Sequence, residues 1–99
     1  MAAYAVVRTY RHLGDFERVA RQVEEGLVPI LREVPGFQGY YAIRSSEGAG
    51  VSVTLFASEK AARAGQEQGA AWVGAHLAEL YGDHPPETVT GELIVAAEP

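Results

Sequence analysis

The sequence predicts an α+β protein with the ferredoxin-like order β-α-β-β-α-β, in which two helices cover one face of a four-stranded antiparallel sheet. Two long segments with apolar residues every three or four positions predict the helices. Segments rich in Val, Tyr and other strand-favouring residues flank them, and a glycine-rich turn joins two of these segments directly. The 99 residues fit one domain, which we place at 1–99.

The first part of the chain predicts one strand followed by one helix. Residues 3–11 are rich in Tyr and Val and contain no breaker, which is typical of a strand. From Phe16 to Val34 the apolar residues recur with helical spacing, and Asp15 is placed to cap this helix. Pro29 lies inside the helix, where a proline costs about 3 kcal/mol. Because the apolar stripe continues past it, we predict one kinked helix rather than two.

The rest of the chain is divided by turn residues and by one strong stop signal. The predicted elements are a strand at 37–45, a turn at 47–50, a strand at 51–57, a helix from Ser58 to about Tyr81, and a strand at 87–97. Ser58 can cap the helix, and Gly-Asp-His-Pro-Pro at 82–86 ends it. This helix is rich in Ala and Gly, so it either approaches the sheet closely or leaves room for a planar ligand.

Both faces of the predicted sheet carry apolar side chains, although two helices can cover only one of them. By alternation along the strands, one face carries Phe37, Tyr41, Ile43, Val51, Val53, Leu55, Val89, Leu93 and Val95. The other face carries Tyr40, Ala42, Phe56, Ile94 and Ala96 among Arg44, Ser52, Thr54 and Glu92. The first face is the more aliphatic, so we assign it to the helices.

The open face would then carry an exposed apolar patch, and such patches usually mark interfaces. We therefore expect a homodimer, in which a two-fold partner packs its own sheet on the open sheet face. The alternative is an ordinary half-exposed sheet with scattered apolar residues, which monomeric proteins also show.

Composition argues against several classes of function. The net charge is −5 and the arginines do not cluster, so nucleic acid is not an expected partner. No apolar run approaches the roughly 20 residues of a membrane span. The first residues do not resemble a signal peptide, so we expect a cytoplasmic location. The absence of cysteine excludes disulfides and thiol catalysis. His12, His76 and His84 lack ligand spacing, so no metal site is predicted.

Residues 34–41, Val-Pro-Gly-Phe-Gln-Gly-Tyr-Tyr, join the first helix to the second strand. This joint resembles the PGF-x-G motif of the antibiotic-biosynthesis-monooxygenase-like superfamily. The strand at 51–56, the helix start at 57–61 and the segment 72–77 fit the same order, so the resemblance covers nearly the whole chain. It implies a dimeric α+β barrel, with a pocket in each protomer between the helices and the inner face of the sheet. Relatives include cofactor-independent monooxygenases that oxidise aromatic polyketides to quinones, and haem-degrading monooxygenases.

The residues that carry catalysis in those relatives are largely missing here. Haem-degrading relatives use an Asn, a Trp and a His, and quinone-forming relatives rely on an Asn with Trp and Tyr. This chain contains no Asn. Counted from the start of the second helix, the Trp position of haem-degrading relatives falls near Ala64 and the His position near Gly74. Haem degradation is therefore not expected, and we predict no cofactor.

Three side chains are our candidates for catalysis. Trp72 and His76 are one helical turn apart, so Trp72 could stack on an aromatic substrate while His76 takes a proton from it. Tyr41 could donate a hydrogen bond to a ligand oxygen. The alternative is that Trp72 packs at the edge of the core, His76 is partly exposed, and Tyr41 is a core residue. Arg8 and Tyr10 share one strand face and could line a pocket mouth, bind a carboxylate, or lie at an edge or interface.

Two functions of different classes follow from these observations, and the sequence leaves open whether the protein is an enzyme. The first is a cofactor-independent, monooxygenase-like oxidation of a small aromatic or polyketide-type substrate, which itself supplies the electrons to oxygen. The second is a non-catalytic dimeric ligand-binding or interaction module, which the missing Asn favours. A third, weaker hypothesis is an isomerase or cyclase that uses His76 or Tyr41 for proton transfer.

Overall fold

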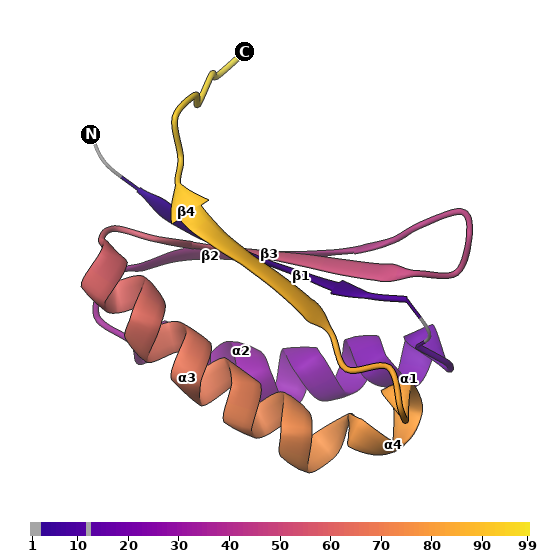
Figure 1. Ribbon diagram of the computed structural model, residues 1–99. Coiled ribbons are helices and arrows are strands. Elements are labelled where there is room, and N and C mark those ends of the chain that lie inside the picture. Colours follow the sequence, from indigo (N-terminus) through magenta and orange to yellow (C-terminus); the bar gives the residue numbers. More distant parts are fainter. Residues whose placement is uncertain (1–2, 12) are drawn as a thin grey trace.

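The computed structural model describes residues 3–11 and 13–99, with a four-stranded antiparallel sheet and the helices packed on one of its faces (Figure 1). The elements are β1 (Tyr4–Tyr10), α1 (Phe16–Gln22), η1 (Val23–Leu27), α2 (Val28–Arg32), β2 (Phe37–Arg44), β3 (Gly50–Phe56), α3 (Glu59–His76), α4 (Ala78–Tyr81) and β4 (Glu87–Glu92). The strand order is β2-β3-β1-β4. The predicted ferredoxin-like α+β fold is confirmed, and the sheet of the single chain is open.

Both predicted N-caps are confirmed. The Asp15 carboxylate accepts a hydrogen bond from the backbone N–H of Arg18 at 3.2 Å, and Asp15 itself has a φ of 51°. The Ser58 hydroxyl accepts from the N–H of Ala61 at 3.1 Å. These bonds satisfy donors that the first helical turn leaves without intrahelical partners, so each helix begins at its capping residue.

The first helical segment continues past Pro29, as predicted, and a π-helical turn stands where we expected a kink. The segment consists of α1, η1 and α2 in direct succession. The N–H of Val28 donates to the carbonyl of Val23, five residues earlier, which widens the helix just before Pro29. Pro29 follows directly, so the wider turn lies where the proline ring would otherwise crowd the carbonyl four residues earlier.

Our assignment of the two sheet faces was wrong for most strand residues. The helices pack on the face that carries Val6, Arg8, Tyr10, Tyr40, Ser52, Thr54 and Phe56. The aliphatic face is open to solvent, and Tyr41, Ile43 and Val89 on it are 58%, 57% and 68% exposed. The assignment followed the larger number of aliphatic residues and was wrong because the helix-facing side carries the polar groups of a cavity under the helices.

A β-bulge explains why simple alternation failed on β2. Phe37 pairs with Phe56 and faces the helices, whereas the next pair is Gly39 with Leu55, on the open face. Gln38 is therefore an additional residue in β2, and it reverses the alternation between Phe37 and the rest of the strand. Phe37 was placed correctly, but the residues placed with it by alternation, Tyr41 among them, lie on the opposite side.

The last strand is shorter than predicted. β4 ends at Glu92 rather than Ala97, although the N–H of Leu93 still donates to the carbonyl of Ala3 at 2.8 Å. The residues that follow extend away from the sheet and helices (Figure 1). They include Ile94 and Val95, which are 86% and 75% exposed, so this end of the chain carries apolar residues that its own fold leaves uncovered.

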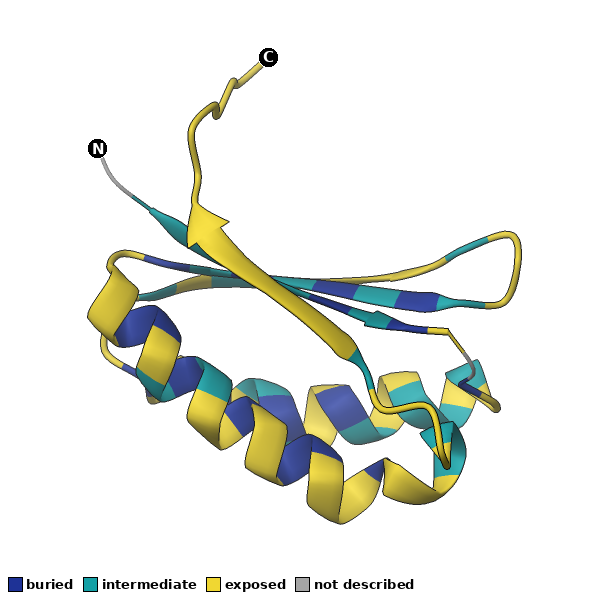
Figure 2. Cartoon of the chain, viewed as in Figure 1, coloured by how far each residue is buried: buried dark blue, intermediate teal, exposed yellow. Residues whose placement is uncertain are grey.

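The small residues of α3 permit close contact between this helix and the sheet. Gly65 packs against the Phe56 ring, and a side chain at this glycine would overlap the ring. Phe56 is 1% exposed and belongs to the buried cluster, and the buried positions of the helices face the sheet (Figure 2). Of the two interpretations of the Ala- and Gly-rich helix, the structure supports close approach.

Candidate functional site

A cavity of about 830 Å³ lies between the first helical segment and the β2–β3 part of the sheet, and it opens to solvent. Its apolar wall comes mainly from the loop after β1, from α1 and η1, and from α3 and the residue after it. The main contributors are Leu13, Phe16, Val19, Val23, Val73 and Leu77. This volume lies within the range of about 300–1,000 Å³ that is typical of small-molecule sites.

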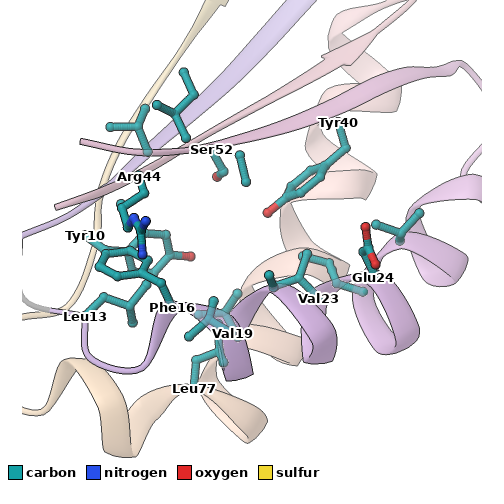
Figure 3. A pocket seen from close by; sticks show the side chains of 18 of the residues that line it. Tyr10, Leu13, Phe16, Val19, Val23, Glu24, Tyr40, Arg44, Ser52 and Leu77 are labelled. Atoms are coloured by element: carbon teal, nitrogen blue, oxygen red, sulfur yellow. The ribbon is translucent and has the colours of Figure 1, made fainter. Parts of the chain in front are cut away.

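Hydroxyl groups of the sheet form a polar end to this cavity. Figure 3 shows the hydroxyls of Tyr10, Tyr40 and Ser52 directed into it from β1, β2 and β3. At another part of the lining, the Arg44 guanidinium lies 5.6 Å from the centroid of the Phe16 ring. Glu24 contributes a carboxylate from η1. The cavity therefore suits a largely apolar molecule with few polar groups.

A second, much smaller cavity of about 20 Å³ adjoins the first. The two share the lining residues Tyr10, Leu27, Tyr40 and Ser52. Arg8 lines the small cavity, is 7% exposed, and donates to the carbonyl of Gln66 in α3 at 3.0 Å. Among the residues that the structure describes, no carboxylate forms an ion pair with Arg8. A buried cation without an acidic partner is rare, because burial of a charge requires compensation.

Burial raises the pKa of both tyrosines at the polar end. For Tyr40 the pKa rises to about 12, chiefly through burial and also through nearby Tyr10, while the Ser52 hydroxyl and Arg8 act in the opposite direction. For Tyr10 burial also raises the pKa, and the adjacent Arg8 opposes this. Both phenols are therefore protonated near neutral pH and can donate hydrogen bonds into the cavity.

The three candidate catalytic side chains lie outside both cavities. Trp72 and His76 share a helix face as predicted, and their rings stack at 4.6 Å with an interplanar angle of 17°. His76 Nδ1 lies 2.9 Å from the carbonyl of Trp72. Trp72 is 7% exposed and contacts Gly26 of η1, where an added Cβ would lie 2.8 Å from the indole nitrogen. Tyr41 lies on the open face of the sheet.

Arg8 and Tyr10, which could line a pocket mouth, bind a carboxylate or lie at an edge or interface, both line the small cavity. Sequence reasoning missed Tyr40 and Ser52, because both were assigned to the open face of the sheet. A signal for them was present in the sequence. Ser52 and Thr54 occupy alternate positions in an otherwise apolar strand, and polar side chains at this spacing mark one face of the strand.

Neither a metal cluster nor a membrane-spanning helix is found in the described part of the chain. No group of three or more metal-ligating side chains lies together within residues 3–11 and 13–99, and His12 is outside these residues. None of the helices within these ranges has the length and apolarity that crossing a membrane requires.

Several solved structures share this fold, whereas no family model and no curated protein sequence matches the chain. A monooxygenase from Streptomyces coelicolor, ActVA-Orf6, in complex with nanaomycin D, is 27% identical with a TM-score of 0.78, over 99% of this chain and 93% of that one. A Nitrosomonas europaea protein of unknown function, NE2512, is 22% identical with a TM-score of 0.76, over 100% and 96% of the two chains.

A third neighbour is SnoaB from Streptomyces nogalater, a cofactor-independent oxygenase that is 15% identical with a TM-score of 0.64. The alignment covers 98% of this chain and 95% of that one. At this identity the likeness extends to the fold alone. Putative antibiotic biosynthesis monooxygenases recur among the other neighbours, so the chain shares the fold of the antibiotic-biosynthesis-monooxygenase-like superfamily that its motif at 34–41 resembles.

Proposed function

We propose that this protein is a cofactor-independent monooxygenase that oxidises a planar aromatic or polyketide-type molecule. The observation that carries the proposal is the cavity of about 830 Å³, whose wall is largely apolar and into which three hydroxyl groups point. The bound nanaomycin D of the Streptomyces coelicolor monooxygenase supports a ligand of related size. Fold likeness to monooxygenases raises this function above others that the same fold could host.

The reaction requires no electron donor other than the substrate. An anthrone-type ring methylene loses two hydrogens and gains one oxygen atom as a carbonyl, while the second atom of O₂ leaves as water. Ionisation of a phenol or enol on the ring makes the carbon electron-rich enough to react with oxygen. The cavity contributes an apolar wall that positions the ring and hydroxyl donors that stabilise an anionic oxygen.

Oxygen uptake with anthrone-type phenols tests the proposal. We expect the purified protein to consume one O₂ per quinone formed, without added flavin, haem or metal and with EDTA present. Phe16→Trp, which fills the cavity from its wall, should reduce the rate of uptake at least about tenfold, because displacement of a substrate from its productive position costs about this much or more. Uptake equal to the uncatalysed rate for a series of such phenols contradicts the proposal.

A non-catalytic ligand-binding module is the second candidate function. The placement of Trp72 and His76 outside both cavities favours it, because no imidazole borders the cavity among the described residues. Under this function the same aromatic molecules bind with the stoichiometry of one per chain, and oxygen uptake stays at the uncatalysed rate. The two measurements on one protein sample distinguish the candidates.

We also propose that a second copy of the chain covers the open sheet face. In the structure this face is richer in apolar residues than the sequence analysis expected, because the aliphatic positions of β2, β3 and β4 lie on it. The apolar residues after Glu92 extend from the edge of the same sheet. A two-fold partner could bury both features at once, which makes a homodimer the simplest assembly.

A further inference from the structure

We propose that the ligand of this cavity carries a single acidic hydroxyl, a phenol or an enol, and that Arg8 binds the oxygen of this group in its ionised form. This inference rests on the proposed cavity function, because the apolar part of the ligand occupies the large cavity. The observation that carries it is a buried guanidinium beside a space of about 20 Å³ that shares Tyr10, Tyr40 and Ser52 with the lining of the large cavity.

The environment of Arg8 provides only part of what a buried cation requires. Its guanidinium donates a hydrogen bond to a neutral acceptor, the Gln66 carbonyl, and lies beside the Tyr10 hydroxyl. Apart from Arg8, the small cavity is lined only by uncharged groups, of which Tyr10 and Tyr40 alone can ionise. With both phenols protonated, no negative charge lines the small cavity among the described residues, and the carboxylates of Glu17 and Glu24 line the large cavity instead. An anionic ligand atom would supply the missing negative charge.

The size of the small cavity limits the chemical class of that anion. A volume of about 20 Å³ accommodates one water-sized group, since roughly 10–15 Å³ is needed for a water molecule. A phenolate or enolate presents one oxygen and fits, whereas a carboxylate presents two oxygens on a branching carbon and does not. The hydroxyls of Tyr40 and Ser52 border both cavities, so they can donate to the same oxygen.

Binding and ionisation of the ligand require no further reactant. The O–H bond of the ligand breaks, its proton passes to solvent through the open side of the large cavity, and the electron pair stays on oxygen beside Arg8. A cation within about 4–6 Å lowers the pKa of an acidic group by about 1–3 units. Burial acts in the opposite direction, as it does on the pKa of Tyr10 and Tyr40 beside the same guanidinium. We expect the charge of Arg8 and the donors of Tyr40 and Ser52 together to exceed the effect of burial, so that the protein ionises a bound phenol at a pH where the free phenol is still protonated.

The test uses 2-naphthol, whose near-ultraviolet absorbance reports its ionisation, titrated over pH with and without excess protein. We expect the ionisation midpoint of the bound probe to lie at least about one pH unit below that of free probe. Two probes with the same ring system serve as comparisons. 2-Methoxynaphthalene has no acidic proton and should bind at least about tenfold more weakly at the midpoint pH, and 2-naphthoic acid should bind more weakly than 2-naphthol.

Arg8→Met removes the charge, and Arg8→Lys retains it. The shift should vanish in Arg8→Met and persist, reduced, in Arg8→Lys. If Arg8→Met fails to fold, Gly69→Ala tests whether the small cavity beside Arg8 is needed for the shift. An added Cβ at Gly69 meets the guanidinium at an ordinary contact distance of 3.5 Å, in the lining of the small cavity, so it fills the space without removing the charge. Gly74→Ala, in the same helix with open space around it, is the matched control and should keep the shift.

The outcomes separate this inference from the proposed function. A shift that persists in both Arg8→Met and Gly69→Ala overturns the role of Arg8, even if oxygen uptake is observed. Equal binding of 2-naphthol and 2-methoxynaphthalene, or preferred binding of 2-naphthoic acid, overturns the ligand class. A normal shift without oxygen uptake leaves the Arg8 site supported and contradicts the monooxygenase.

Discussion

At the scale of single residues, the chemistry of this protein depends on which strand side chains face inward. Arg8, Tyr10, Tyr40 and Ser52 come from three different strands and meet because antiparallel pairing aligns them on one face, with Arg8 opposite Ser52. Each is polar, and each borders the small cavity under the helices. Their polarity is tolerated there because they contact one another and a cavity rather than closely packed apolar groups.

The ionisation of Tyr40 makes the stability of the protein decrease at alkaline pH. Its pKa is about 12 in the folded state and about 10 in the unfolded state. The folded state therefore holds a proton that the unfolded state has lost between these values. The stabilising contribution is complete below about pH 10, falls as pH rises, and is lost as pH passes about 12.

Chemical denaturation at a series of pH values from 8 to about 12 measures this dependence, and Tyr40→Phe is the matched variant. We expect the free energy of unfolding of the wild type to fall more steeply over this range than that of the variant. Parallel slopes in the two proteins would show that Tyr40 ionises equally in both states.

Substitution of Trp72 tests whether this residue has a packing role or a catalytic role. Its indole is 7% exposed between Gly26 and His76, so Trp72→Ala should lower the free energy of unfolding by about 3–5 kcal/mol. His76→Ala, at an exposed ring, should cost less than about 1 kcal/mol. Thermal and urea unfolding measure both. Unchanged stability of Trp72→Ala together with lost binding of aromatic ligands would restore Trp72 as a ligand-contacting residue.

At the scale of elements, the distance between α3 and the sheet is set by a glycine. Gly65 faces the Phe56 ring so closely that Gly65→Ala should destabilise the protein by about 1–3 kcal/mol through overpacking. This loss would occur although alanine favours a helix by about 1 kcal/mol over glycine. Gly74→Ala has nothing within 4 Å of the added atom and should stabilise the protein.

The melting temperatures of these two variants, measured beside that of the wild type, check this prediction. Opposite signs are expected. A stabilising Gly65→Ala would mean that α3 can move away from the sheet without loss of packing.

At the scale of the whole molecule, the open sheet face determines the assembly. If a second copy covers it, an unpaired lysine placed there must lose its hydration on association, at a cost of several kcal/mol. Val89→Lys should therefore raise the dimer dissociation constant by at least about a hundredfold, since each tenfold change corresponds to about 1.4 kcal/mol.

Light scattering coupled to size-exclusion chromatography over a range of concentrations measures this dissociation constant. Gln68→Lys, which adds the same charge at an exposed position of α3, is the control and should remain dimeric. A wild-type protein that is monomeric at micromolar concentration would contradict the dimer.

The sequence by itself determined the order and type of the elements. The helical spacing of apolar residues, the caps at Asp15 and Ser58, and the stop after Tyr81 depend on interactions within one or two turns. Such local signals do not need the rest of the chain. The motif at 34–41 then indicated the superfamily, and the neighbours of the structure agree with it.

The tertiary structure alone decided which sheet face the helices cover and which side chains form the site. The bulge at Gln38 shifts the strand register by one residue, and one such shift moves Tyr40 inward and Tyr41 outward. A count of aliphatic residues could not identify the buried face, because that face includes a cavity lined partly by polar groups. Cavities arise from the packing of distant segments, here α1 and η1 over β2 and β3, and no local pattern in the sequence encodes their volume.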